Sequence, residues 1–219
     1  MRVRERLGIT KRRQEQASRI MQLSLFGFLF VGLYEMNVGI VVNAALGILI
    51  TQLPAILERD YDIPMDAGLT LWISAAVFLH ALGTVGLPHT EAFYGNVGWW
   101  DHMTHVVSSS IVAAAGYATA RAFDEHHHDL HFPPSFMFAF LLCITLAFGV
   151  FWEVIEFAVS ELATLVGSAE SALTIYGVKD TMLDLVYDTI GGILVAVWGT
   201  VYLTDVSEAV RIRLSNRDT

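Results

Sequence analysis

Residues 20–57 decide the fold, and they read IMQLSLFGFLFVGLYEMNVGIVVNAALGILITQLPAIL. A membrane-spanning helix needs about 20 apolar residues to cross about 30 Å of hydrocarbon. One helix of this length would extend about 57 Å at 1.5 Å per residue, which is nearly twice that thickness and would need an extreme tilt. The interruption at Glu35-Met36-Asn37 therefore favours a tight hairpin of two helices, at about 20–34 and 37–57.

Further apolar blocks follow this hairpin, at about 68–87, 100–122, 135–158 and 181–203. The composition agrees, because 54% of the 219 residues are hydrophobic and only 16% are charged, whereas soluble domains carry about 25% charged residues. The sequence predicts an all-α integral membrane protein, a six-span helical bundle. Its expected parts are a basic N-terminal segment (1–19), the transmembrane domain (20–203) and a C-terminal tail (204–219). The N-terminal stretch lacks the features of a cleavable signal peptide.

The basic residues choose between six spans and five, because loops on the cytoplasmic side are rich in lysine and arginine. With six spans, twelve of the thirteen basic residues lie inside and only Lys179 lies outside. With five spans, eight lie inside and five outside. We therefore predict six spans in the plasma membrane, with both termini and the flanking segments in the cytoplasm.

The net charge of −9 argues against nucleic acid as a partner. Acidic loops at 58–62 and 124–129 suggest a halophilic bacterial or archaeal source. The single cysteine, Cys143, excludes a disulfide within the chain and any metal motif built on cysteines. Membrane lipid is the expected partner, and the sequence does not indicate an oligomeric state.

The predicted topology brings ionisable residues from five segments to the outer side of the membrane. Residues three or four apart share a face of a helix, and this spacing relates Asp101 and His102 to His105, and Glu153 to Glu156. A third group forms one acidic stripe down the last span. Together with the residues that line their surroundings, the candidate site residues are Glu35, His80, Asp101, His102, His105, Glu153, Glu156, Asp180, Asp184 and Asp188.

Carboxylates on one stripe repel each other, and an ionised aspartate at the centre of a span costs about 2.5–3.5 kcal/mol. A divalent metal ion is the simplest compensation, with ligands drawn from Asp101, His102, His105, Glu153, Glu156, Asp180 and Asp184. Carboxylates with histidines suit zinc, manganese or iron, whereas magnesium would rely on the carboxylates alone. In the alternative, the carboxylates stay protonated and bind hydroxyl groups such as those of Ser108, Ser109, Ser110 and Tyr187.

Several motifs resemble those of the YjdF-like family of small inner-membrane proteins. They are Glu35 after the first span, His80 near the end of the third, Trp100-Asp101-His102-Met103-Thr104-His105, Leu146-Ala147-Phe148 with Trp152-Glu153-Val154-Ile155-Glu156, and Asp180 with Asp184. The resemblance covers about residues 30–203 and implies the same six-span layout but no known activity. Leu185 stands where the family has methionine, and the stretch before Asp180 is reduced. Residues 188–192 resemble the last motif of VanZ-like proteins, but the rest of the chain fits that family less well.

Three functions remain open at this point. The first is a metal-dependent membrane hydrolase or transferase that acts on a lipid or lipid-linked substrate, with Glu153 or His105 as general base. The second is a transporter for a cation or a proton-coupled small molecule, with Asp188 and Glu153 as a relay. The third is a non-catalytic membrane module in which the polar residues only assemble helices.

Overall fold

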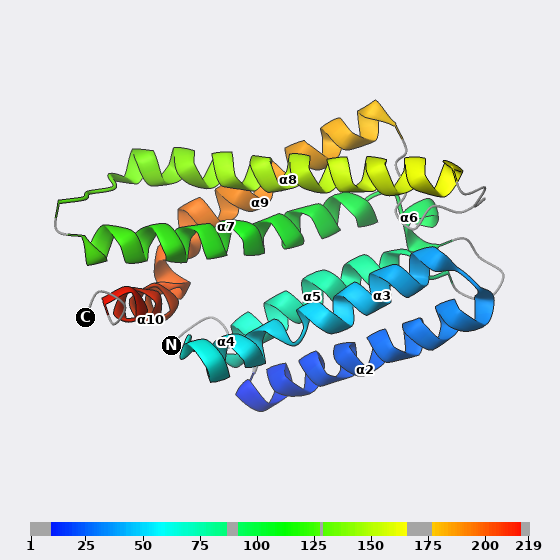
Figure 1. Ribbon diagram of the computed structural model, residues 1–219, viewed down its shortest axis with the longest axis horizontal. Coiled ribbons are helices and arrows are strands. Elements are labelled where there is room, and N and C mark those ends of the chain that lie inside the picture. Colours follow the sequence, from blue (N-terminus) through cyan, green and yellow to red (C-terminus); the bar gives the residue numbers. More distant parts are fainter. Residues whose placement is uncertain (1–9, 87–91, 128, 166–176, 216–219) are drawn as a thin grey trace.

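The computed structural model describes residues 10–86, 92–127, 129–165 and 177–215, and the regular elements in these ranges are helices. Six long helices run alternately in opposite directions along the long axis of the molecule (Figure 1). They are α2 (Lys11–Glu35), α3 (Val38–Ile50), α5 (Ala67–Gly83), α7 (Trp100–His126), α8 (Pro134–Leu165) and α9 (Val178–Tyr202). Three shorter helices connect or follow them: α4 (Leu53–Tyr61), α6 (Phe93–Asn96) and α10 (Thr204–Ser215).

The stretch 20–57 forms a helical hairpin, and the alternative of one long helix is wrong. Met36 ends α2 with a left-handed backbone (φ 57°), and the Asn37 side chain caps α3 by accepting a hydrogen bond from the Ile40 amide at 3.0 Å. Gly32 lets α3 approach closely, since a Cβ there would lie 2.9 Å from Val41. The sharp turn follows from the combination of a positive φ with a side-chain cap.

Three helix boundaries differ most from the predicted blocks. α2 begins at Lys11 rather than near 20, because Thr10 caps it and the lysine, arginine and glutamine residues that follow favour helix. The block at 37–57 breaks at Thr51, and α4 starts with Pro54 in its first turn, a position that proline suits. α8 continues to Leu165, well beyond 158.

The predicted C-terminal tail contains a helix that packs against the rest of the molecule. Arg213 on α10 donates hydrogen bonds to the Asp62 side chain (3.1 Å) and to the Asp60 carbonyl (2.6 Å). Its guanidinium also lies 5.2 Å from the centre of the Tyr61 ring. These contacts fix α10 to the end of α4.

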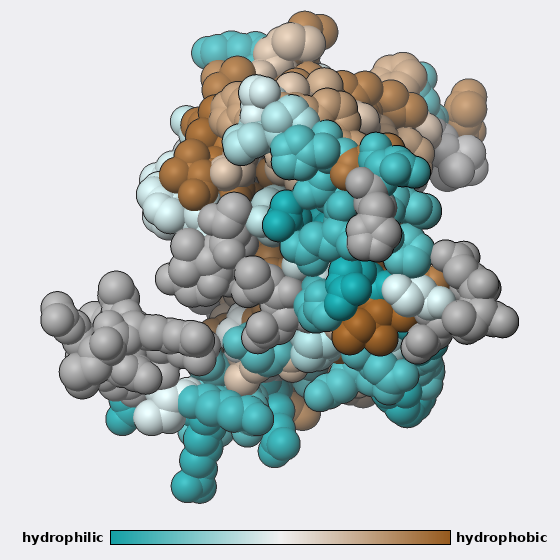
Figure 2. All heavy atoms as spheres, turned by 90° about the vertical axis from the view of Figure 1, so that its left-hand side faces the viewer, coloured by the Kyte–Doolittle hydropathy of each residue, from teal (hydrophilic) through white to brown (hydrophobic). Residues whose placement is uncertain are grey.

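In the part of the chain that the structure describes, four helical segments are long and apolar enough to cross a membrane: Lys11–Glu35, Val38–Tyr61, Pro134–Ala158 and Val178–Trp198. α5 is apolar but shorter, and α7 begins with the polar cluster described below. Large hydrophobic side chains such as Leu23 and Phe151 are exposed on the flanks, as expected for surfaces that face lipid. Figure 2 looks at the end where α10 lies, which is largely hydrophilic with a hydrophobic rim along the top. The chain is therefore a multi-pass membrane protein, while the count of six spans and the orientation stay predictions.

Small residues allow α7, α8 and α9 to pack closely. A Cβ on Gly191 of α9 would overlap the Ser109 hydroxyl and the Val106 carbonyl of α7. Gly116 of α7 lies against Ile144 of α8, and Gly192 of α9 against Thr145 of α8. Small residues at such positions let the backbones of membrane helices approach each other, so the three helices form one tight unit.

Replacing Gly191 by alanine should destabilise this unit, because the added methyl group meets backbone and side-chain atoms of α7 that cannot retreat. Overpacking of this kind costs about 1–3 kcal/mol, or about 2–4 °C in Tm per kcal/mol for a chain of this size. Gly27→Ala is the matched control, since a Cβ on Gly27 meets nothing within 4 Å. Thermal unfolding in detergent measures both variants. Equal Tm values for the two would show that α7 and α9 are not tightly packed at Gly191.

The orientation is tested by cysteine labelling in a Cys143→Ser background, because Cys143 is the single natural cysteine. Gly98 and Asp129 are both exposed and lie beyond opposite ends of α7. In intact cells, an impermeant maleimide should label Gly98→Cys, and Asp129→Cys only after the membrane is opened. The reverse pattern would refute cytoplasmic termini, and labelling of both in intact cells would show that α7 does not span.

Candidate metal centre

The ionisable residues of the site come from three helices and meet at the end of the bundle where α6 lies (Figure 1). Asp101, His102 and His105 occupy the first two turns of α7. Glu153 and Glu156 lie on α8, and Asp184 and Asp188 on α9. Of these seven side chains, Glu153, Glu156, His105, Asp184 and Asp188 are buried. The predicted convergence is therefore observed for the residues of these three helices.

His105 and Asp188 form the deepest pair. His105 Nδ1 lies 3.2 Å from Asp188 Oδ1, and the two residues are 8% and 4% exposed. Gly149 of α8 faces Asp188, and any Cβ there would overlap the carboxylate. Because an ionised carboxylate can only accept, this contact assigns the donor to Nδ1 and leaves the lone pair of a neutral ring on Nε2. Histidines that bind metals commonly donate their other ring N–H to a carboxylate in this way.

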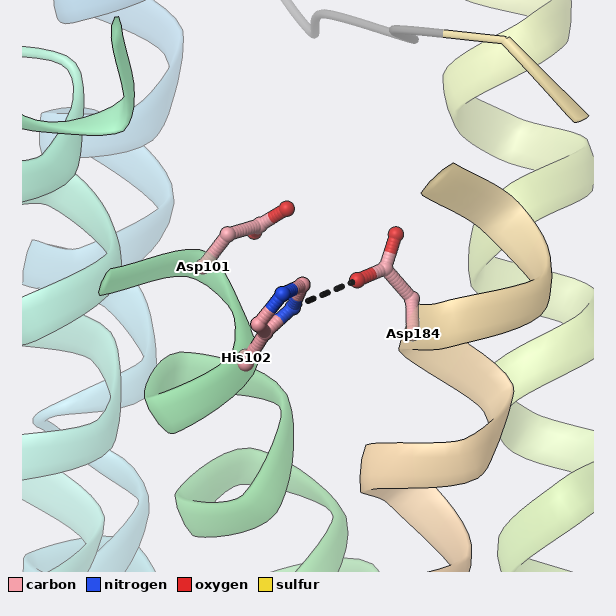
Figure 3. Close-up of side chains that lie close together, drawn as sticks. All are labelled: Asp101, His102 and Asp184. Atoms are coloured by element: carbon pink, nitrogen blue, oxygen red, sulfur yellow. Dashed lines mark ion pairs between the residues drawn. The ribbon is translucent and has the colours of Figure 1, made fainter. Parts of the chain in front are cut away.

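The free nitrogen of His105 points towards two further carboxylates. His105 Nε2 lies 3.8 Å from Asp184 Oδ1 and 3.7 Å from Asp101 Oδ1. His102 Nδ1 also lies 3.8 Å from Asp184 Oδ1. Figure 3 marks this contact with a dashed line, and Asp101 lies beside it. These distances are too long for hydrogen bonds. Two ligands that each lie about 2.1 Å from one ion are about 3.0–4.2 Å apart, depending on the angle between them, so the spacing suits a cation between the side chains.

Two groups of side chains have the spacing of metal ligands. One contains Asp101, His102 and Asp184, and the other contains His105, Glu153 and Asp184, with the ligand atoms of each group within 4.8 Å of one another. Within the described residues, four buried side-chain atoms have no hydrogen-bond partner, and three of them belong here: His102 Nδ1, Glu153 Oε1 and Asp184 Oδ1. Burying such atoms without a partner costs free energy, which a bound cation would offset.

Two of the hydroxyl groups that could have bound protonated carboxylates, those of Ser109 and Ser110, are used elsewhere. Ser109 donates to the His105 carbonyl at 2.6 Å, and Ser110 to the Val107 carbonyl at 2.6 Å. Both bonds stay within α7. Tyr187 lies flat against the His102 ring, with 4.2 Å between the ring centres. The Ser109 and Ser110 hydroxyls therefore donate to the backbone of α7 and not to the carboxylates of the site.

His80 and Glu156 lie beside the two groups rather than in them. His80 Nδ1 and Tyr94 Oη of α6 share a hydrogen bond of 2.7 Å, and the His80 ring meets the edge of Trp152 at 5.4 Å between centres. Trp152 Nε1 donates to Glu156 Oε1 at 3.0 Å. This layer ties α5 and α6 to α8 and covers the site from the side of α5.

Two other predicted residues also lie outside the groups. Glu35 is exposed in the last turn of α2, and Asp180 is half-buried one turn before Asp184 on α9. Sequence reasoning missed Tyr94 and Gly149. Tyr94 carried no signal, because its partner lies on another helix. Gly149 carried no signal as a site residue either, because it contributes only the space that the Asp188 carboxylate fills.

Comparison with known proteins gives a family but no activity. The family model described as "Predicted membrane protein (DUF2238)" matches residues 17–205. A relative from Thermotoga maritima, which bears the name "Uncharacterized protein", is 27% identical over 142 residues; the match spans 63% of this chain and 65% of that protein. No solved structure matches.

Asp184→Asn separates a bound cation from a protonated carboxylate. If Asp184 binds a divalent cation, the variant should lose metal and Tm, because binding stabilises the folded state. At free metal near 100 times Kd this term is about 2.7 kcal/mol, or about 5–10 °C in Tm. The measurements are metal content and Tm, with and without chelator, and Asp129→Asn, an exposed aspartate of the α7–α8 connection, is the control.

A protonated Asp184 predicts the opposite result for the same variant. If Asp184 is protonated instead, asparagine imitates the neutral acid, and the variant should be as stable as the wild type or more so. A wild type whose Tm ignores the chelator, together with such a variant, would rule out the metal centre.

Proposed function

The chain belongs to the DUF2238 family of predicted membrane proteins, the family of the YjdF-like proteins. We propose that this member of the family is a metal-dependent hydrolase or transferase. Its substrate is a lipid or a lipid-linked ester, and it acts at the outer side of the membrane. The observation that carries the proposal is the set of carboxylates and histidines spaced for a cation, three of whose buried atoms have no hydrogen-bond partner. Such a buried, charged constellation in a membrane protein marks a functional site.

A cavity beside the site supports a lipid as the substrate. It has a volume of about 500 Å³ and lies between α2, α5, α7 and α9. Its walls are mostly apolar and include Leu69, Trp72, Val106, Val107, Leu194 and Trp198. Val106, which lines the cavity, directly follows His105 in α7, so the cavity and the site lie at neighbouring levels of this helix. A hydrocarbon chain in this cavity would hold its polar head at the metal centre.

The chemistry that follows is ester hydrolysis at a phosphoryl or carbonyl group. A cation held by Asp184, Glu153 and the histidines would polarise the oxygen of that group. Water supplies the attacking oxygen, which bonds to phosphorus or carbon, while the bond to the ester oxygen breaks and its electron pair leaves with the alcohol. Glu153 would be a ligand of the cation and would also take the proton of the water and pass it to the departing alcohol. In a transferase, a second alcohol replaces the water.

The same cavity also favours a transporter as the second candidate. It reaches from Val106 to Gln14 and Asp66 near the opposite end of the bundle, and it could lead a cation or a proton towards Asp188 and Glu153. The apolar walls favour the lipid, because a hydrated ion needs polar groups along its path. A non-catalytic module would use neither the cavity nor the unpartnered atoms.

The test incubates purified protein in nanodiscs with lipid phosphate esters and lipid carboxyl esters, with Mn²⁺ or Zn²⁺. Phosphate or alcohol release is followed by mass spectrometry. We expect release that a chelator abolishes and that Glu153→Gln lowers about 10²–10⁴-fold, the usual effect of losing a general base. The control is Glu161→Gln, at an exposed position about two turns further along α8.

Chain length provides a second readout. If the cavity holds the hydrocarbon, kcat/KM should rise with chain length until the cavity is full. Trp198→Ala should weaken this dependence while leaving short soluble esters unaffected. Metal-dependent ion flux into vesicles, without hydrolysis of any ester, would support the transporter and refute the enzyme.

A further inference from the structure

Asp184 is a member of both ligand groups, and this shared position carries an inference beyond a single metal ion. We propose that the site binds two divalent cations and that the Asp184 carboxylate bridges them. One cation lies with Asp101 and His102, and the other with His105 and Glu153. The inference rests on the proposed function and narrows its substrate to phosphate esters.

His102 and His105 approach Asp184 from positions three residues apart along α7. Each has a ring nitrogen 3.8 Å from the same atom, Asp184 Oδ1. Residues three apart on a helix differ by about 4.5 Å along its axis, which is close to the separation of about 3.5–4 Å between the ions of two-metal sites. Each histidine can therefore serve its own cation while the carboxylate between them serves both.

The unpartnered atoms divide in the same way. His102 Nδ1 belongs to the first group, Glu153 Oε1 to the second, and Asp184 Oδ1 to both. Asp184 and Glu153 are 3% and 7% exposed, so water does not readily replace the missing partners. A single cation placed in either group would leave a buried atom of the other group without a partner.

The charges of the two groups and of Asp188 are consistent with two ions. Asp101, Glu153 and Asp184 are the carboxylates of the two groups, and Asp188 holds His105. If all four are ionised, two divalent cations neutralise them, whereas one cation leaves two negative charges in a medium where unpaired charge is costly. The nearest basic residue in sequence, Lys179, is exposed at the start of α9 and does not supply this charge.

The arrangement specifies the substrate chemistry. Each cation receives three protein ligands, the number that leaves a coordination position open in catalytic sites. Two cations at such a separation can hold the attacking and leaving oxygens of an in-line displacement at phosphorus. The inferred substrate is therefore the phosphate ester of a lipid, with its hydrocarbon in the cavity that Val106 lines.

The experiment measures the number and coupling of bound Mn²⁺ ions. The full chain in detergent is stripped of metal, loaded with Mn²⁺ and freed of excess ion, and its metal content is determined together with its electron paramagnetic resonance spectrum. We expect two Mn²⁺ per chain and an exchange-coupled spectrum, because the shared carboxylate links the ions. His102→Gln and Glu153→Gln should each reduce the content to one ion and give the six-line spectrum of isolated Mn²⁺. Glu161→Gln should retain two coupled ions.

The wild-type measurement alone can overturn the proposal, so it does not depend on how well the variants fold. One Mn²⁺ per chain with a six-line spectrum would refute the bridged pair and leave a single-ion enzyme intact. Two uncoupled ions would refute the bridge by Asp184. Absence of any bound Mn²⁺ or Zn²⁺ would refute this inference and the proposed function together.

Discussion

The hydrogen bond between His105 and Asp188 determines how α7 and α9 can lie against each other. Both partners are buried, and an unpaired charge at either position would be costly in a membrane. The pair can form only because Gly149 leaves room for the carboxylate and Gly191 lets the two backbones come together. Once it is made, the other nitrogen of His105 and the carboxylate one turn earlier on α9 are held in place. The remaining site contacts follow from that position.

The long helices were largely predictable because each contains an apolar block, and the hairpin at Glu35–Asn37 followed from the length of residues 20–57 and their polar interruption. The ends were less predictable. The start of α2 depends on a threonine cap and on residues that favour helix without being apolar, and α10 is held by Arg213 and Tyr61, which are distant in sequence. A hydropathy pattern detects segments that lie in lipid. It does not detect a helix cap, helix-favouring polar residues, or contacts between residues that are distant in sequence.

The candidate site was predictable as a set of helix faces but not as a geometry. Spacing of three and four residues placed His102 with His105 and Asp184 with Asp188, and the structure brings these faces together. Spacing could not show that Asp188 orients a histidine while Asp184 lies between two of them. That difference depends on the rotation of α9 about its own axis relative to α7. Glu35 was included for its depth alone and is exposed, because depth in a membrane does not fix direction.

The helices that carry the ligand groups differ from the helices on the far side of the cavity, and this has a mechanical consequence. The two candidate ligand groups lie on α7, α8 and α9, whereas α2 and α5 supply one wall of the cavity. The two walls are joined near the site by the Trp100 indole, which donates to the Leu79 carbonyl at 3.1 Å. A sideways displacement of α2 and α5 would widen or narrow the cavity while every distance among the ligands stayed the same. In the proposed enzyme, a long chain would thus enter and leave through one part of the structure without disturbing the part that holds the ligand groups.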